Sequence, residues 1–255
     1  MIVAGLLVTV ALYAWGVAGA YRAGHAIGFA PLAAFALAIV TLAGVLIGPM
    51  DVLSDAALSW HMAQHMALID FVAPLFVLAA PVRLALAALP VRSASRLARA
   101  FASPPLSWVF NPAFAWLQLA AVLFGVHFSP LYEAALENEG VHAAEHVLFI
   151  ASGIIFWTPL LAVAPAPHAP SYPVRLLSIF LALPMSAFLG FAFYVARYAL
   201  YPHYAKLPGA LADQTNAGAV MWIAGGGPLF VALLWLVAEW GARERRFGAA
   251  FDRTQ

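Results

Sequence analysis

The sequence predicts an all-α integral membrane protein, a bundle of seven transmembrane helices that forms a single domain over residues 1–255. Hydrophobic residues make up 65% of the chain and charged residues 9%, whereas a soluble globular chain is about half apolar and about a quarter charged. Apolar runs recur along the whole length, each near the roughly 20 residues that a helix needs to cross a bilayer. The connecting segments show no internal repeat, soluble domain or low-complexity tail.

Seven apolar runs give the predicted spans. In chain order they are Ile2–Ala20, Ile27–Gly48, Ala56–Ala80, Trp108–Val126, Val141–Val163, Val174–Ala196 and Ala217–Trp240. The first run ends in small residues that resemble a signal-peptide cleavage site, but no cation precedes it and Arg22 follows it, so we expect a retained helix. The segment Val82–Arg99 predicts a short amphipathic helix on the inner leaflet.

The distribution of cations predicts the orientation of the bundle. Of the twelve Lys and Arg residues, only Arg197 and Lys206 fall in even-numbered loops; the other ten lie in odd-numbered loops and the C-terminal segment. Because cytoplasmic loops carry the excess of positive charge, the C-terminus is expected in the cytoplasm and the N-terminus outside. The net charge of +1 gives no indication of nucleic-acid binding.

Five of the eight histidines fall at the predicted outer ends of three spans. His61 and His65 begin the third span, His127 ends the fourth, and His142 and His146 begin the fifth. A spacing of four places both imidazoles of a pair on one helix face, about 5–6 Å apart. Each pair can therefore converge on a metal ion, and we expect these histidines to form a metal site.

The acidic and thioether side chains near these histidines extend the candidate site. Asp213 begins the seventh span from the same side and is a sixth candidate ligand. Glu145 lies one turn after His142 and can orient a histidine or bind the metal itself. The accessory residues expected at or beside the site are Met62, Met66, Glu145, Gln214 and Met221. Together with Gly218 and Gly225, Gln214 and Met221 also form a small, polar helix face suited to close packing.

Ordinary structural interpretations account for the other polar and aromatic residues. His25, His168 and His203 are expected to be solvated or packed. Methionines are common apolar fillers. Asp70 lies about 13 Å deeper than His61 along the third span, where an isolated carboxylate costs roughly 3 kcal/mol; it is expected to be protonated, paired or part of a relay. Interfacial aromatic residues are expected at Trp60, Tyr132, Tyr198, Tyr201 and Tyr204.

Four ordered motifs resemble the CtaG family of multi-span assembly factors for haem–copper cytochrome c oxidases. They are HMAQHM from His61, HFSPLYEAAL from His127, HAAEHVLFIASGIIFW from His142 and DQTNAGAVMW from Asp213. The family's motif residues fall here at His61, His65, His127, His142, His146, Asp213 and Gln214. A single-span copper chaperone that shares the name depends on cysteines, and this chain has none.

The resemblance implies a role in oxidase maturation, as an assembly factor rather than an enzyme. It implies copper insertion in the bacterial inner (cytoplasmic) membrane, with a cytochrome c oxidase subunit, the lipid bilayer and a periplasmic copper donor as partners. No nucleic-acid partner is expected.

The metal itself is predicted from the ligand types. Imidazole suits zinc, copper, iron and nickel, and thioethers favour Cu(I), so copper is expected, with zinc or haem iron as alternatives. Two other functions stay open. A ceramidase-like zinc hydrolase would use His142, His146, one histidine of the third span and Asp213 around a metal-bound water. A bis-histidine haem protein would use axial histidines from different helices.

Overall fold

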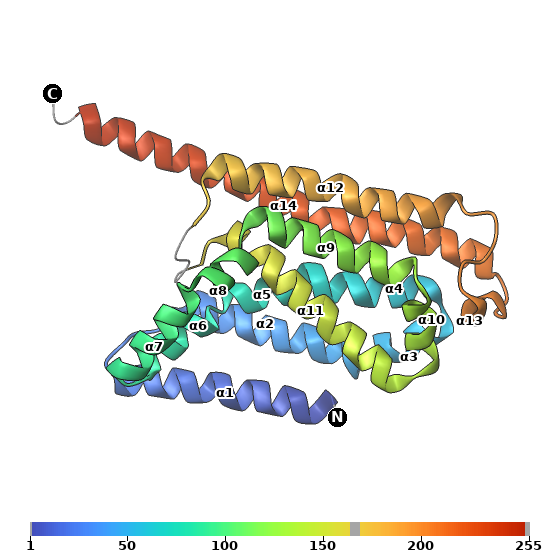
Figure 1. The fold of residues 1–255 in the computed structure, drawn as a ribbon, viewed down its shortest axis with the longest axis horizontal. Coiled ribbons are helices and arrows are strands. Elements are labelled where there is room, and N and C mark those ends of the chain that lie inside the picture. Colours follow the sequence, from blue (N-terminus) through green and yellow to red (C-terminus); the bar gives the residue numbers. More distant parts are fainter. Residues whose placement is uncertain (1, 164–168, 253–255) are drawn as a thin grey trace.

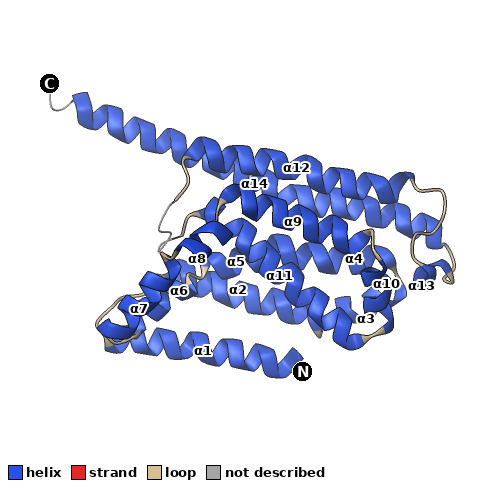
Figure 2. Ribbon diagram, viewed as in Figure 1, coloured by secondary structure: helices blue, strands red, loops and turns tan. Residues whose placement is uncertain are grey.

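The computed structural model describes residues 2–163 and 169–252, and His168 lies outside this part. Within it all regular structure is helical and no strand occurs (Figure 2), as the composition predicts. The helices are, in chain order, α1 (Ile2–Arg22), α2 (Phe29–Leu46), α3 (Pro49–Ala56), α4 (Leu58–Ala67), η1 (Leu68–Val72), α5 (Ala73–Leu78), α6 (Pro81–Ala88), α7 (Val91–Phe101), α8 (Pro104–Val109), α9 (Pro112–His127), α10 (Pro130–Glu137), α11 (Glu139–Leu161), α12 (Tyr172–Val195), α13 (Pro202–Ala205) and α14 (Ala210–Asp252).

The long helices run side by side as a bundle (Figure 1). Among the described residues, six helical stretches are long and apolar enough to cross a membrane: α1, α2 with α3, α4 through α6, α11, α12 and α14. Helix α9 would be a seventh span if it is counted with α10, from which it is bent by 65°. The short helices α3, α10 and α13 lie at the same end of the bundle as the start of α1, and α7 lies at the opposite end.

Two predicted segments are divided by proline. The predicted amphipathic helix is two helices, α6 and α7, because Pro90 between them disfavours a helical residue before it. The fourth predicted span begins later than expected, since α8 ends at Val109 and α9 starts afresh at Pro112. There the side chain of Asn111 accepts a hydrogen bond from the N–H of Ala113, which stabilises the new helix start.

The third span contains a wide turn that the apolar pattern does not predict. The π-helical segment η1 separates α4 from α5, and such turns insert an extra residue into a helix. The carbonyl of Ile69 accepts a hydrogen bond of 3.0 Å from Trp157 Nε1. Gly153 of α11 faces the same turn so closely that a Cβ there would lie 2.7 Å from the Cβ of Ala73. Helix α11 therefore packs directly on this span, and both helices carry candidate histidines.

Helices α12 and α14 approach each other backbone to backbone. Gly190 and Gly218 face each other so closely that a Cβ on Gly218 would clash with the carbonyl oxygen of Gly190 and lie 2.7 Å from the backbone nitrogen of Tyr194. The small-residue face of the seventh predicted span thus makes the close helix contact that the sequence predicts.

The orientation of the bundle stays a prediction that labelling can test. We expect cysteines introduced at Glu137 and Lys206, which are exposed at the end that carries α10 and α13, to react with an impermeant thiol reagent in intact cells. Cysteines at Arg96 and Arg246, also exposed, should react only after the cells are opened, because the cation bias places them in the cytoplasm. No native cysteine competes. Labelling of intact cells at position 96 but not at position 137 would show that the bundle has the opposite orientation.

Candidate metal centre

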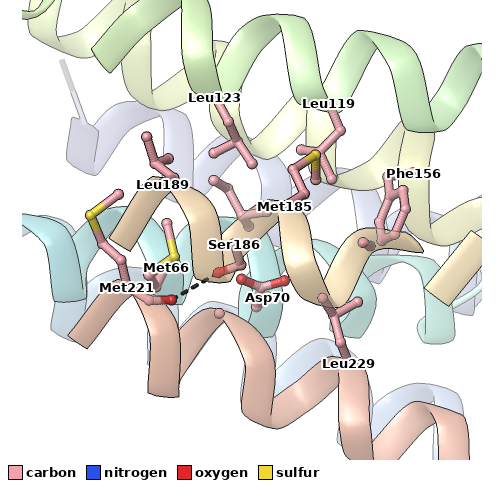
Figure 3. A pocket seen from close by; sticks show the side chains of 13 residues that line it. Met66, Asp70, Leu119, Leu123, Phe156, Met185, Ser186, Leu189, Met221 and Leu229 are labelled. Carbon is pink, nitrogen blue, oxygen red and sulfur yellow. Dashed lines mark hydrogen bonds between the residues drawn. The ribbon is translucent and has the colours of Figure 1, made fainter. Parts of the chain in front are cut away.

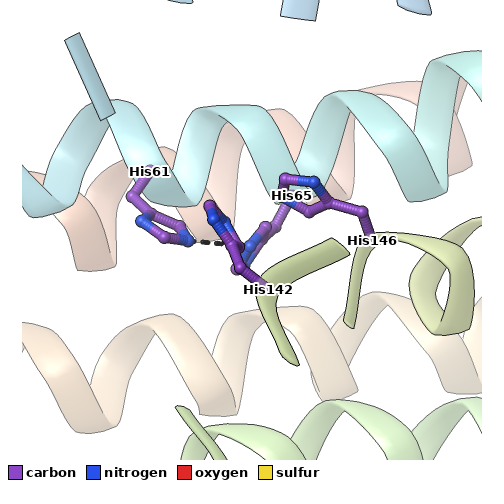
Figure 4. A group of neighbouring side chains, drawn as sticks. All are labelled: His61, His65, His142 and His146. Atoms are coloured by element: carbon purple, nitrogen blue, oxygen red, sulfur yellow. Dashed lines mark hydrogen bonds between the residues drawn. The ribbon is translucent and has the colours of Figure 1, made fainter. Parts of the chain in front are cut away.

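Four histidine side chains meet between α4 and α11 (Figure 4). One ring nitrogen from each of His61, His65, His142 and His146 lies within 4.8 Å of the others. Three of these residues are buried and His142 is half-buried. Two nitrogens bound to one ion at 2.0–2.1 Å stand about 3.4 Å apart in a tetrahedral site and about 4.1 Å apart on opposite sides of the ion, so a pair at 4.8 Å has to close by roughly 0.7–1.4 Å to bind one metal.

A tyrosine fixes the tautomer of His61. The hydroxyl of Tyr204 donates its single proton to the carbonyl oxygen of Ser54 at 2.7 Å and also lies 2.8 Å from His61 Nδ1. Burial raises the pKa of Tyr204 well above its usual range, so the hydroxyl keeps this proton. His61 Nδ1 must therefore donate to Tyr204, which leaves a lone pair on His61 Nε2 for a metal.

The other ring nitrogens leave hydrogen-bonding capacity unused within the group. His65 Nε2 lies 2.9 Å from His61 Nε2. Among the described residues, His65 Nδ1 and the Nε2 atoms of His142 and His146 have no hydrogen-bond partner. A buried polar atom left unpaired costs about 1–3 kcal/mol. Several such atoms within one group of four histidines favour a group arranged to receive a ligand.

The two candidate carboxylates occupy different positions. Glu145 is buried, its Oε2 atom lies 3.7 Å from His65 Nε2, and neither oxygen has a hydrogen-bond partner in the described chain. It can orient His65 or bind the metal. Asp213 is not one of the group of four; its carboxylate accepts hydrogen bonds from the hydroxyl and the backbone N–H of Ser59. Asp213 thus holds α14 to the first turn of α4, where an anion stabilises the helix start.

The remaining candidates lie outside the group of four. His127 is buried with its ring centre 6.1 Å from that of His65; its Nδ1 lies 2.7 Å from the carbonyl of Leu123, and its Nε2 has no partner in the described chain. The amide of Gln214 bonds the backbone of Tyr198 and Leu200, so it braces the connection between α12 and α14. Met62 packs in the core. Met66 and Met221 line a separate cavity.

Three tyrosines that the sequence predicts in an interfacial belt lie beside the histidines instead. That interpretation is wrong for Tyr132, Tyr201 and Tyr204, which are all buried. The Tyr132 ring centre lies 5.4 Å from that of His61, and Tyr132 stacks on Tyr201 at 4.1 Å. Tyr198 and Trp60 are exposed, and for them the belt stays a prediction. The sequence signal was weak, because these tyrosines lie on short connecting helices and loops whose packing no periodicity reveals.

We expect Tyr204→Phe to weaken metal binding by about 10–100-fold, because it removes the acceptor that orients His61. The measurement is the dissociation constant of the purified protein for copper in competition with a chelator. Tyr198→Phe is the matched control, since that ring is exposed in the same connection. Equal affinity in Tyr204→Phe and wild type would exclude the orienting role.

The fold and the histidine group together define a class: a multi-span helical membrane protein with a buried cluster of imidazoles at one end of the bundle, able to hold a metal ion. The comparison with family models makes this specific. Residues 11–243 match the model for the cytochrome c oxidase caa3 assembly factor, CtaG, and the chain belongs to that family.

Similar proteins occur in mycobacteria. The chain is 29% identical over 219 residues to a protein of Mycobacterium bovis and to one of Mycobacterium tuberculosis, and 27% identical over 212 residues to a protein of Mycobacterium leprae. All three are described as uncharacterized. The matches cover 78% of this chain and 32% of each relative, so the chain spans about a third of the length of these proteins. No solved structure matches it.

Proposed function

We propose that this protein binds copper through His61, His65, His142 and His146 and supplies it to a haem–copper cytochrome c oxidase during assembly. The observation that carries the proposal is the convergence of these four imidazoles within 4.8 Å, in a chain of an oxidase assembly factor family. His127 and Glu145 stand close enough to serve the ion as it enters or leaves. Asp213 acts by holding the start of α4.

The ligand chemistry supports copper as the cargo. Imidazole nitrogens bind Cu(II) more tightly than the other divalent ions of the first transition series, and they also accept Cu(I). The chain contains no cysteine, so no thiolate can trap the ion. A cargo must also be released, and a histidine site that still has to close to bind one ion fits reversible binding.

The depth of the histidines supports delivery within the membrane. A bare ion in hydrocarbon is prohibitively costly, and imidazoles recessed inside a helix bundle offer a bound position below the membrane surface. We place the protein in a bacterial cytoplasmic membrane with its histidine end outward. An oxidase subunit and a copper donor on the outer side are then its partners, and it acts as an assembly factor rather than as an enzyme.

Two observations favour this function over the alternatives. The hydrolase alternative requires Asp213 at the zinc site, but the Asp213 carboxylate accepts hydrogen bonds from Ser59 instead. The haem alternative requires a porphyrin between histidines, but the imidazole rings contact one another. Their centres lie 4.2 Å apart in the α11 pair, 4.4 Å apart in the α4 pair and 5.0 Å apart between His61 and His142. A single small ion fits between such rings.

The test is the metal content and optical spectrum of the protein purified from membranes. We expect bound copper without a haem absorption band, and loss of that copper in the His61→Ala/His65→Ala variant. His25→Ala is the matched control, because His25 is exposed and far from the group in the chain. A haem band, or zinc together with amidase activity, would favour one of the alternatives and overturn the copper proposal.

A further inference from the structure

A small cavity lies inside the bundle, between the third span, α9, α11, α12 and α14 (Figure 3). Its volume is about 20 Å³, enough for one particle the size of a water molecule. Its polar and sulfur-bearing lining comes from three spans. Met66 of α4 and Asp70 of η1 belong to the third span of the chain, Met185 and Ser186 belong to α12, and Met221 belongs to α14. Met66 follows His65 directly along α4, so the cavity and the histidine group share one helix turn on different faces of α4.

Asp70 is a buried carboxyl group without a partner. Asp70 is 7% exposed, and its carboxyl group makes no hydrogen bond or ion pair with any residue that the structure describes. The hydroxyl of Ser186, which borders the same cavity, donates its proton to the carbonyl of Met221 at 2.8 Å and so has none to offer Asp70. Asp70 sits in the π-helical turn η1, a distortion that is common at functional sites.

The sulfur atoms add soft ligands around this acid. A Cβ on Gly225 would lie 3.1 Å from Met66 Sδ and would clash with Ser186 Oγ, so the absence of a side chain at Gly225 leaves room for both groups. Three of the six methionines of the chain line this one cavity, each on a different helix. Methionine often serves as apolar filler, but filler does not explain an unpaired carboxyl group in the same lining.

We propose that this cavity is a second metal position that takes Cu(I), bound by the thioethers of Met66 and Met185 and the carboxylate of Asp70, with Met221 at its edge. Thioether sulfur is a soft ligand that favours Cu(I), and the carboxylate balances its charge. The inference deepens the proposed function and rests on it: Cu(I), with no change of oxidation state, passes from the imidazoles of His61 and His65 along α4 to the thioethers without leaving protein ligands.

Asp70 also borders a second pocket, on the outer side of the bundle. Asp70 lines, besides this cavity, an apolar groove of about 720 Å³ between α5 and α14, bordered by Phe71, Trp235 and Val231. These three side chains are exposed on the surface of the described chain. Asp70 therefore stands between the inner cavity and the lipid-facing side of the bundle, where a membrane-embedded acceptor can approach.

The test loads the purified full-length protein with Cu(I) under anaerobic, reducing conditions and measures copper per chain together with X-ray absorption at the copper edge. We expect two copper ions per wild-type chain and both nitrogen and sulfur scatterers. Met66→Leu/Met185→Leu, which conserves volume, should lose one ion and the sulfur signal. Asp70→Asn should lower occupancy of the same ion. Met62→Leu is the matched control, because Met62 is a buried methionine of α4 that does not line the cavity.

The outcomes separate this inference from the function on which it rests. His61→Ala/His65→Ala should lose the nitrogen-bound ion and keep the sulfur-bound one. One copper ion with nitrogen scatterers alone in wild type would overturn the second position and leave the histidine centre standing. If Met62→Leu lost the sulfur signal and Met66→Leu/Met185→Leu kept it, the sulfur ligands of copper would lie outside this cavity. That result would also overturn the second metal position. A wild-type chain that binds no copper would reject both.

Discussion

Replacing His142 and His146 together by alanine is expected to leave the host's haem–copper oxidase largely inactive. Two of the four imidazoles of the group disappear, and an ion held by half of its ligands is lost readily. The oxidase should then keep its haem and lack copper, with activity below about a tenth of the wild-type level. The measurement is oxidase activity and copper content in a deletion strain complemented with each variant.

The single variants are expected to resemble the double one. His142→Ala and His146→Ala should each impair maturation strongly, and combining them should add little, because residues that bind one ion act as a unit. Their ring centres lie 4.2 Å apart, close enough for such coupling. His25→Ala should complement fully, since that side chain is exposed. Full complementation by the double variant would reject metal handling and leave only a scaffold role in oxidase assembly.

The helices and the meeting of the histidines could be predicted because both depend on simple periodicities. Apolar runs of sufficient length mark helices that can cross a bilayer. A spacing of four places His61 with His65, and His142 with His146, on single helix faces. The same depth on neighbouring helices then lets the two pairs meet, as the four ring nitrogens do.

The surroundings of the histidines could not be predicted, because they depend on connections without periodicity. Tyr204 reaches His61 from the short helix α13 between α12 and α14, across 143 positions of the chain. Asp213 shares the depth of the histidines, yet its carboxylate is used by the first turn of α4. Depth alone does not reveal which way a side chain points around its helix, and so it does not separate a ligand from a helix cap.

The π-helical turn in the third span likewise has no sequence signature. The apolar pattern of a membrane-spanning run does not change when one turn of the helix contains an extra residue. The turn is stabilised by a partner on another helix, since Trp157 donates to the carbonyl of Ile69. The π-helical turn also sets the direction of the Asp70 side chain. The sequence therefore predicts that a carboxylate at this depth is costly, but it does not predict which residues surround it.

The contact between α12 and α14 carries the other large expected effect: Gly218→Ala should destabilise the bundle by about 1–3 kcal/mol. A methyl group at this position meets the carbonyl oxygen of Gly190 and the backbone of Tyr194, and neither can rotate away as a side chain would. The helices must separate, and contacts between closely approaching backbones supply much of the association of helices in lipid. The measurement is the thermal unfolding midpoint of the purified protein and its amount in membranes.

Gly226→Ala on the same helix is the matched control for this effect. A Cβ on Gly226 meets no atom within 4 Å, so the change adds helix propensity of up to about 1 kcal/mol without a steric cost. We therefore expect Gly218→Ala to lower the unfolding midpoint and Gly226→Ala to leave it unchanged or raise it. Because α14 also carries Asp213 to the start of α4, Gly218→Ala should lower copper retention as well. Equal midpoints for the two variants would show that the backbone approach of α12 and α14 contributes little to stability.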